Sequence, residues 1–392
     1  MSKKVPQIRF NGFTDPWEER KLSDISNVTK LAGFEFTKYV RYQESGKIIA
    51  LRGLNVKNGK LVLDEVKYID DSDFSKLNRS KLYKNDILLT YVGTVGELAI
   101  VPENDKYYLA PNVARIRLQD HVNSIFVCQM MNDSNFYNRI ISPLIATSSQ
   151  PALSMENVRK FQLLMPDYQE QEKIGSFFKQ LDDTIALHQR KLDLLKEQKK
   201  GYLQKMFPKN GAKVPELRFA GFADDWEERK LNENVENIGT GRSSFKAGLD
   251  YSEQTPYEVL GSTSVISYSD SFDHSGNFVL TARVGANAGN LYKHSGNVKI
   301  SDNTVYIQSK NLEFIFYLLT KYDLKKLAFG TGQPLIKASE LKNLKLFFPK
   351  KFGEQQKIGS FFKQLDETIA LHQRKLDLLK EQKKGFLQKM FV

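Results

Sequence analysis

Apolar residues recur at alternating steps of four and three along two long stretches of the chain. The first seam contains Ile174, Phe178, Leu181, Ile185, Leu192 and Leu195, and the second contains Ile358, Phe362, Leu365, Ile369, Leu376 and Leu379. This spacing is the a/d pattern of a coiled coil. A helix of about 33 residues spans roughly 50 Å at 1.5 Å per residue. We therefore predict two long helices, each with an apolar seam that needs a partner.

Polar residues interrupt both seams at the same places. His188 and Lys199 stand in the first seam, and His372 and Lys383 stand in the second. These side chains could form a ligand or catalytic site. Single polar residues in a seam more often fix the register of the paired helices, and we favour that interpretation.

The two seams belong to an internal repeat. Lys173–Phe207 returns as Lys357–Phe391 with only two differences, Asp183 to Glu367 and Tyr202 to Phe386. A second repeat precedes each copy, since Pro6-Gln-Ile-Arg-Phe and Trp17-Glu-Glu-Arg-Lys-Leu return as Pro215-Glu-Leu-Arg-Phe and Trp226-Glu-Glu-Arg-Lys-Leu. The chain therefore contains two tandem units. We predict that the helices pair in antiparallel fashion, because this makes the units equivalent about a pseudo-twofold axis.

Short β-like runs separated by turn residues fill the rest of each unit. We expect strands at Lys47–Leu51, Asp86–Tyr91, Leu98–Val101, Val113–Leu118, Tyr257–Leu260, Phe278–Ala282 and Thr304–Gln308, and helices near Ser124–Ile141 and Glu313–Lys326. The predicted class is α+β with mainly antiparallel sheets. The predicted boundaries are 1–165 and 208–348 for the globular domains and 166–207 and 349–392 for the long helices.

The globular domains also correspond to each other, although less closely. Asp86–Gly93 pairs with Asn277–Gly285, which has one residue more; Ala110–Val113 pairs with Ser301–Thr304, and Gln150-Pro151 with Gln333-Pro334. Gly93-Thr-Val-Gly96 and Gly285-Ala-Asn-Ala-Gly289 faintly resemble phosphate-binding loops. Each lies between two predicted strands, so we expect hairpin turns.

Composition and charge favour a folded protein with an anionic partner. Of 392 residues 41% are hydrophobic, and 58 Lys and Arg against 46 Asp and Glu give a net charge of +12. This excess favours a nucleic-acid or other anionic partner. The single cysteine, Cys128, excludes a disulfide framework and is expected to be buried. No signal peptide or membrane-spanning run is evident, so we expect a soluble, cytoplasmic protein without a membrane partner.

Sequence motifs for catalysis are missing. The chain has no Walker-type loop, no His-Glu-x-x-His, no Cys-x-x-Cys and no Pro-Pro of an amino-methylating enzyme. Glu19-Arg-Lys21 and Glu228-Arg-Lys230 superficially match a nuclease motif, but surface salt bridges explain them better. The histidines are too scattered to bind a metal ion.

Basic and polar residues instead suggest a binding surface. Arg, Gln, Asn, Ser and Thr can read base edges, whereas Lys more often neutralises phosphate. The candidate DNA-binding residues are Lys38, Arg41, Arg52, Lys57, Arg79, Lys81, Lys84, Arg115, Ser148, Ser149, Gln150, Arg242, Ser243, Ser244, Lys246, Arg283, Lys293, Thr331 and Gln333.

One further motif strongly resembles a known family. Pro166-x3-Glu170-Gln171-x2-Ile174 recurs as Pro349…Glu354-Gln355…Ile358 with one added residue. Together with the Gln-Pro segments and the Trp-Glu-Glu-Arg-Lys-Leu openings, this pattern resembles the specificity subunit of type I restriction–modification enzymes over essentially the whole chain.

The resemblance implies a non-catalytic DNA-recognition subunit. In such a subunit two target-recognition domains, held apart by an antiparallel helix pair, each read one half of an asymmetric, bipartite site in double-stranded DNA. It also implies two modification subunits, which use S-adenosylmethionine to methylate adenine N6. Two restriction subunits would supply ATP- and Mg²⁺-dependent translocation and cleavage. No cofactor is expected in this chain.

Two other classes stay open from the residues alone. A self-sufficient nuclease or methyltransferase would act without partners, but it lacks the expected motifs. A bivalent coiled-coil adaptor, or a non-specific nucleic-acid-binding protein such as an RNA binder, would show weak and sequence-indifferent affinity for DNA.

Overall fold

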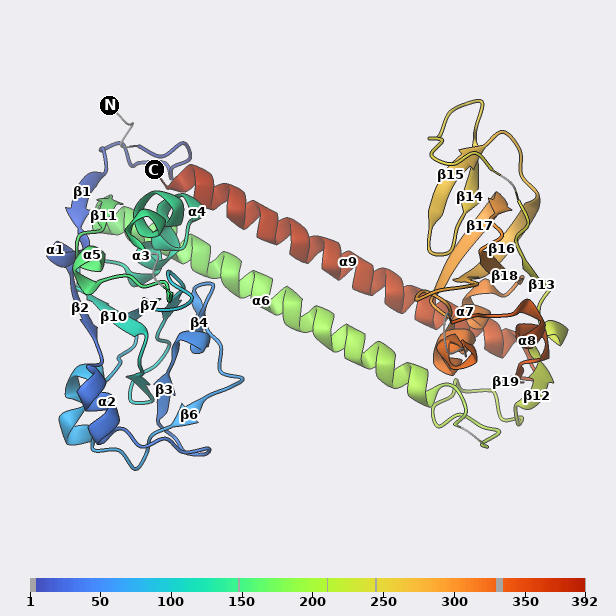
Figure 1. Ribbon diagram of the computed structural model, residues 1–392, viewed down its shortest axis with the longest axis horizontal. Coiled ribbons are helices and arrows are strands. Elements are labelled where there is room, and N and C mark those ends of the chain that lie inside the picture. Colours follow the sequence, from blue (N-terminus) through green and yellow to red (C-terminus); the bar gives the residue numbers. More distant parts are fainter. Residues whose placement is uncertain (1–4, 147–148, 210, 244, 329–333, 392) are drawn as a thin grey trace. The chain divides into compact units, whose positions relative to one another are not determined.

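The computed structural model describes residues 5–146, 149–209, 211–243, 245–328 and 334–391. The chain folds as two compact units. Unit 1 combines Met1–His188 with Lys375–Val392, and unit 2 is Gln189–Arg374. Each unit therefore contains part of both long helices, α6 (Tyr168–Lys205) and α9 (Phe352–Met390) (Figure 1).

Unit 1 is built around two small sheets. A four-stranded antiparallel sheet has the order β2-β10-β7-β8, and a three-stranded mixed sheet has the order β6-β3-β9. Its strands are β1 (Glu18–Lys21), β2 (Ser26–Lys30), β3 (Ile49–Leu51), β4 (Val56–Lys57), β5 (Lys60–Leu61), β6 (Lys67–Tyr68), β7 (Ile87–Thr90), β8 (Leu98–Ile100), β9 (Tyr107–Leu109), β10 (Val113–Leu118) and β11 (Gln162–Met165). Its shorter helices are α1 (Leu22–Ile25), α2 (Gly33–Tyr39), α3 (Ser124–Met131), α4 (Ser134–Phe136) and α5 (Met155–Arg159).

Unit 2 has one six-stranded sheet in the order β13-β18-β16-β17-β14-β15, in which only the β14–β17 pair is parallel. Its strands are β12 (Glu227–Lys230), β13 (Asn237–Thr240), β14 (Tyr257–Leu260), β15 (Val265–Ser269), β16 (His274–Ala282), β17 (Leu291–Ile300), β18 (Thr304–Gln308) and β19 (Lys345–Phe348). Its shorter helices are α7 (Leu312–Tyr322) and α8 (Ala338–Asn343). The α+β class with mainly antiparallel sheets is thus confirmed.

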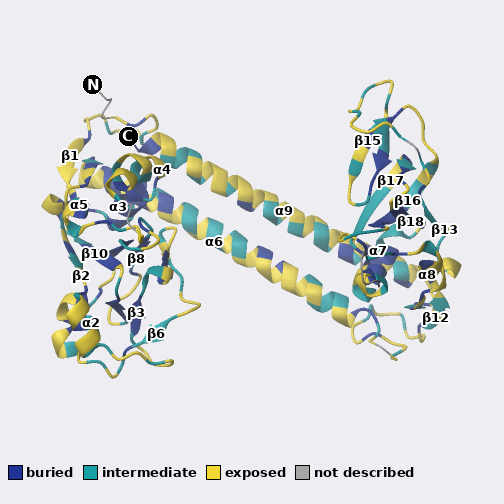
Figure 2. Ribbon diagram, viewed as in Figure 1, coloured by how far each residue is buried: buried dark blue, intermediate teal, exposed yellow. Residues whose placement is uncertain are grey.

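The long helices pair in antiparallel fashion within each unit, as predicted. In unit 1 Phe177 of α6 contacts Phe386 of α9, and Asp182 contacts Lys383. In unit 2 the contacts are Lys199 with Asp366 and Tyr202 with Phe361. The seam residues Ile174, Phe178, Leu192, Leu195, Ile358, Phe362 and Leu376 are buried, and Leu181, Ile185, Leu365, Ile369 and Leu379 are half-buried. Outward residues of both helices are mostly exposed (Figure 2).

The seam lysines form ion pairs that also reach the globular domains. Lys383 Nζ lies 2.8 Å from Asp182, and Gln129 of α3 donates to the same carboxylate at 2.8 Å. In unit 2 Lys199 Nζ lies 2.5 Å from Asp366, which also accepts from the hydroxyl of Tyr317 at 2.6 Å. Lysine therefore does more than interrupt the seam, because each pair joins both long helices and a domain helix.

A cluster of four aromatic rings lies in the core of each unit. In unit 1 Trp17, Phe126, Phe178 and Phe391 contact one another at centroid distances of 5.5–6.3 Å. Trp226, Phe314, Phe362 and Phe207 repeat this cluster in unit 2 at 6.0–6.2 Å. Because Phe391 follows α9 and Phe207 follows α6, each core needs a residue from the helix that arrives from the other half of the chain.

The repeated opening segments tie two helix ends together. In unit 1 Ile8 N donates to Lys389 O at the end of α9, and Arg9 donates two bonds of 2.7 Å to Glu170 at the start of α6. In unit 2 Leu217 N donates to Lys205 O, and Arg218 donates to Glu354 at 2.7 and 2.8 Å.

The glutamine beside each glutamate has an equally constant position. Gln171 accepts from Asn123 N and donates to Pro166 O, whereas Gln355 accepts from Asn311 Nδ2 and donates to Pro349 O. The Pro…Glu-Gln motif therefore connects the start of each long helix to the opening segment and to the start of a domain helix.

Several predicted elements differ from the observed ones. The helix expected at Ser124–Ile141 ends at Met131, because the Asp133 side chain accepts from Asn135 N and begins a new short turn that continues as a π-helix at Tyr137–Ile141. β17 was not predicted, and β16 begins four residues before the predicted Phe278. Residues of the two Glu-Arg-Lys segments form surface ion pairs as expected, although with partners outside the segments: Arg20 with Glu18, Arg229 with Glu227, and Glu228 with Lys345. None of the described helices has the length and apolar character needed to span a membrane.

Candidate nucleic-acid interface

Three chain segments meet at one end of the four-stranded sheet of unit 1. Tyr91 N donates to Asn112 O at 3.0 Å, Gly93 N donates to Pro151 O at 2.9 Å, and Leu153 N donates to Tyr91 O at 2.8 Å. We call Tyr91–Gly93, Asn112 and Pro151–Leu153 the turn cluster of unit 1. Gly93 begins the predicted hairpin turn, which joins β7 to its antiparallel partner β8.

Unit 2 repeats these three bonds with different residues. Arg283 N donates to Asn303 O at 2.8 Å, Gly285 N to Pro334 O at 3.0 Å, and Ile336 N to Arg283 O at 2.8 Å. The turn cluster of unit 2 is therefore Arg283–Gly285, Asn303 and Pro334–Ile336. The predicted correspondences between glycine loops, asparagines and Gln-Pro segments thus appear in the structure as equal backbone bonds. The first residues of the predicted pairing, Asp86 with Asn277, are one position out of register. Counted back from Gly93 and Gly285, Tyr91 corresponds to Arg283.

The turn cluster of unit 1 borders a groove of about 580 Å³. Two predicted DNA-binding residues, Arg52 and Lys57, line this groove together with Thr94 and Asn112. Leu54 and Tyr42, which are 51% and 41% exposed, also line it. A groove with cationic, amide and aromatic groups can contact both the phosphates and the base edges of a nucleic acid.

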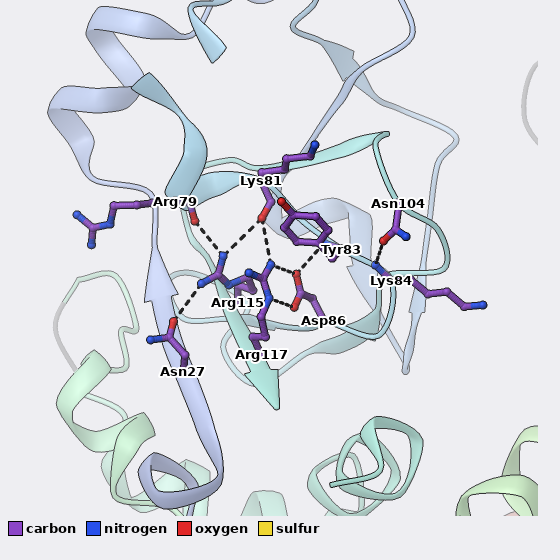
Figure 3. A network of polar contacts seen from close by, with 9 residues as sticks. All are labelled: Asn27, Arg79, Lys81, Tyr83, Lys84, Asp86, Asn104, Arg115 and Arg117. Atoms are coloured by element: carbon purple, nitrogen blue, oxygen red, sulfur yellow. Dashed lines mark hydrogen bonds and ion pairs between the residues drawn. The ribbon is translucent and has the colours of Figure 1, made fainter. Parts of the chain in front are cut away.

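Arg115, which we predicted to bind DNA, has an internal position instead. Only 6% of the residue is exposed, and its guanidinium donates to Arg79 O at 3.1 Å and to Asn27 Oδ1 at 3.0 Å (Figure 3). Burial lowers the pKa of the Arg115 guanidinium below its ordinary value. Arg115 therefore supports the loop that contains Arg79 and does not lie on the surface.

Its neighbour Arg117 completes this support. Arg117 donates two bonds of 2.7 Å to Asp86, and the guanidinium lies 4.5 Å from the centre of the Tyr83 ring. The hydrogen bond to Asp86 raises the pKa of Arg117. Figure 3 shows the Arg79 and Lys84 side chains pointing away from this network. The network thus holds a loop whose outer surface presents two of the predicted cations.

The other predicted residues fall into three groups. Exposed residues are Lys38, Arg41, Lys57, Arg79, Lys84, Ser149, Gln150, Arg242, Lys246 and Arg283. Residues with bonds inside the protein are Arg52, which donates to Glu65 O, Lys81, paired with Asp105 at 2.7 Å, Ser243, bound to Asp273, and Lys293, paired with Glu313 at 2.5 Å. Ser148, Ser244, Thr331 and Gln333 lie outside the described residues.

Two residues at the turn cluster of unit 1 were absent from the sequence-based prediction of DNA-binding residues. Tyr91 was overlooked because it reads as the apolar end of a strand. Lys30 on β2 was overlooked because only the sheet register brings its Nζ to 5.1 Å from the Tyr91 ring. Among the described residues no cluster of His, Cys, Asp and Glu could hold a metal ion.

A family model for the type I restriction modification DNA specificity domain matches residues 14–197 and again 223–381. These two matches cover most of the chain and follow its internal repeat. The chain belongs to this family of type I DNA specificity proteins.

Relatives over the full length agree with this family. The chain is 20% identical to the putative type I restriction enzyme MjaX specificity subunit of Methanocaldococcus jannaschii, over 95% of this chain and 92% of that one. It is 22% identical to the MjaVIII specificity subunit of the same organism, over 90% and 89%. The fold is similar to the type I S subunit of M. genitalium, with a TM-score of 0.67, 14% identity and 99% of both chains covered. This family member is thus a type I specificity subunit, the non-catalytic recognition component of its system.

Proposed function

We propose that this specificity subunit reads an asymmetric, bipartite site in double-stranded DNA, with one half-site for each unit. The observation that carries this proposal is the repeated turn cluster, which has the same three backbone bonds in both units but a half-buried tyrosine, Tyr91, where unit 2 has an exposed arginine, Arg283. Equal frameworks with unequal side chains suit two readers of different sequences. The net charge of +12 supports attraction to the DNA backbone.

The long helices would set the number of unread base pairs between the half-sites. Their near-identical sequences and the two seam ion pairs, Lys383–Asp182 and Lys199–Asp366, support a defined register. A one-heptad slip would separate both lysines from their carboxylates and leave partly buried charges unpaired. Such a slip is therefore unfavourable, and the helices would keep the distance between the two units constant.

Exposed leucines on the long helices offer equivalent docking sites for two modification subunits. In unit 1 Leu187 of α6 is 66% exposed and Leu378 of α9 is 54% exposed. Their repeats in unit 2, Leu371 and Leu194, are 59% and 52% exposed. Large apolar side chains exposed at equivalent positions of both units suit two copies of one partner.

The chemistry would belong to the partners. Modification subunits that carry S-adenosylmethionine would extrude and methylate adenine N6, and restriction subunits would use ATP and Mg²⁺ for translocation and cleavage. The chain itself would supply recognition and docking. Sequence-specific recognition of duplex DNA distinguishes this role from that of a bivalent adaptor or a sequence-indifferent binder.

Methylation mapping tests the proposed function. The chain is co-expressed with its modification subunits, and adenine methylation is mapped by methylation-aware sequencing, with the modification subunits alone as the control. We expect methylation at one split sequence only when this chain is present. Methylation at a continuous palindrome, or none at all, would contradict the proposal, and sequence-indifferent DNA binding would favour the adaptor.

Leucine variants test the docking sites separately. Leu187→Asp with Leu378→Asp should remove one modification subunit from the complex, and Leu371→Asp with Leu194→Asp should remove the other, as measured by native mass spectrometry. Gln198→Asp with Gln382→Asp, at exposed positions of the same helices, is the matched control. A full complement of partners on both leucine variants would refute docking at these residues.

A further inference from the structure

Tyr91 and Arg283 occupy the same position in the two turn clusters. Each residue donates its backbone N–H to an asparagine carbonyl, Asn112 O or Asn303 O, at 3.0 and 2.8 Å. The carbonyl oxygen of each accepts a hydrogen bond of 2.8 Å, from Leu153 N in unit 1 and from Ile336 N in unit 2. The backbone groups are therefore committed to the framework, so only the side chain can differ in function between the units.

The neighbouring strand position differs in the same way. Lys30 pairs with Ala114 in the sheet of unit 1, and Thr240 pairs with Val305, the equivalent residue, in unit 2. Unit 1 thus presents an aromatic ring with a lysine Nζ 5.1 Å from its centre. Unit 2 has an exposed arginine, Arg283, and a threonine at the strand position of Lys30. The two surfaces have the same backbone and different recognition chemistry.

The glycine two residues after each of these side chains has open space around its Cα in both units. Gly93 and Gly285 have φ angles of +80° and +91°, and a Cβ built on either would meet no heavy atom within 4 Å. Open space next to glycine lets a ligand approach the backbone closely. Asn112 and Asn303, whose carbonyls accept these backbone bonds, are exposed, and their side-chain amides can also contact a base.

We propose that Tyr91 and Arg283 are equivalent specificity-determining residues, each contacting one base pair of the half-site read by its own unit. This inference rests on the proposed DNA-reading function. Arg283 donates two parallel hydrogen bonds to O6 and N7 of a guanine in the major groove. Tyr91 places its ring and hydroxyl against a base edge, and Lys30 reaches a neighbouring phosphate.

The phenol of Tyr91 is suited to donate a hydrogen bond. Partial burial raises the pKa of Tyr91 above its ordinary value, against a smaller lowering by a hydrogen bond with the Asn112 backbone, and the hydroxyl is protonated at neutral pH as in any tyrosine. Lys30 Nζ, 5.1 Å from the ring centre, supplies positive charge beside the ring.

Arginine substitution in the complete methyltransferase complex tests this assignment. Methylation rates are measured on duplex libraries that carry every single-base change in both half-sites. Arg283→Ala should reduce discrimination by about 10- to 100-fold at one base pair of one half-site, which is the usual worth of a bidentate arginine–guanine contact. Arg283→Lys should retain part of the guanine preference. Tyr91→Ala should change one base pair of the other half-site.

Lys363→Ala provides the matched control, because it removes one exposed cation from α9 of the same unit. It should lower affinity for all sequences about equally and change no base preference. If the wild-type complex methylates no split sequence, the proposed function fails. If it does, but Arg283→Ala and Tyr91→Ala leave every preference unchanged or alter the same half-site, only the present inference is overturned.

Discussion

Arg9 donates two hydrogen bonds of 2.7 Å to the carboxylate of Glu170, although the two residues are 161 positions apart in the chain. The Glu170 side chain is fully buried, and the same pair recurs as Arg218 and Glu354. The hydrogen bond to Glu170 raises the pKa of Arg9, so the guanidinium stays charged at neutral and alkaline pH. The glutamate of the Pro…Glu-Gln motif thus serves to attach the opening segment.

Arg9→Ala should destabilise unit 1 by about 3–5 kcal/mol, because it leaves a buried carboxylate without its partner. Urea unfolding measures this loss in a Trp226→Phe background, in which Trp17 is the remaining tryptophan. Arg20→Ala removes an exposed ion pair with Glu18 and should cost less than about 1 kcal/mol. Equal losses in the two variants would show that Arg9 has no special role.

Lys383→Ala should cost about 1–3 kcal/mol, because Asp182 then loses a charged partner in a partly buried seam. A double-mutant cycle with Asp182→Ala should give a coupling free energy of at least about 0.5 kcal/mol. Lys179→Ala is the control, since it removes an exposed pair with Asp183 on the same helix and should cost under about 0.5 kcal/mol. Strictly additive single and double variants would argue against a register-fixing pair.

Leu192→Asp with Leu376→Asp should abolish helix pairing and both half-site recognition. Both leucines are almost completely buried, so each aspartate would bring an unpaired charge into the seam. Circular dichroism and methylation of the split site measure the two losses. Gln198→Asp with Gln382→Asp changes exposed positions of the same helices and should leave both the fold and the methylation intact. Methylation that survives the buried substitutions would refute the paired seam.

Cys128 should resist thiol reagents as long as unit 1 is folded. Burial raises the pKa of its thiol to about 12, so almost no thiolate exists at pH 8. A reagent such as 5,5′-dithiobis(2-nitrobenzoate) should react only after addition of denaturant. Because the folded pKa exceeds the unfolded value of about 8.5, the stability that this thiol contributes is complete below pH 8.5 and is lost as the pH rises towards 12. Rapid labelling of the native protein would contradict this burial.

Exchange of residues 22–161 for the same region of another family member should change one half-site only. This segment begins after β1 and ends before β11, so the opening segment and the pair of strands beside α6 stay intact. Gln129 must be restored in the graft, since it donates to Asp182. Methylation mapping reads the result, and a simultaneous change of both half-sites would contradict separate reading by the units.

The sequence alone predicts the long helices well, because their register depends on a local pattern. Ile174 and Phe178, spaced for a seam, are indeed buried in it. β17 could not be predicted, since Leu291–Ile300 contains lysine, histidine, serine and glycine and becomes a strand through eight residue pairs with β16. Tertiary pairing there outweighs the local preference.

Candidate site residues were less predictable, because surface and interior arginines look alike in a sequence. Arg115 lies within a β-like run and Arg283 directly follows one, yet the first is buried under a loop and the second is exposed. Only the pairing of β10 with β2 shows that Arg115 reaches Asn27. By contrast, the equivalence of Tyr91 and Arg283 could have been found by aligning the two units from their glycines.

Phe391, which stacks against Phe178 beside Trp17, has a consequence for biosynthesis. Translation delivers unit 1 first, yet its aromatic core remains incomplete until residues 375–391 emerge from the ribosome. Unit 2 receives Phe207 early and contains no later residue than Arg374, so we expect the order of maturation to be the reverse of the order of synthesis. In ribosome-bound nascent chains that end at Arg374 and continue in an unstructured linker long enough to fill the exit tunnel, unit 2 should therefore be protected from protease while unit 1 is still digested. Equal protection of both units at that length would exclude this order.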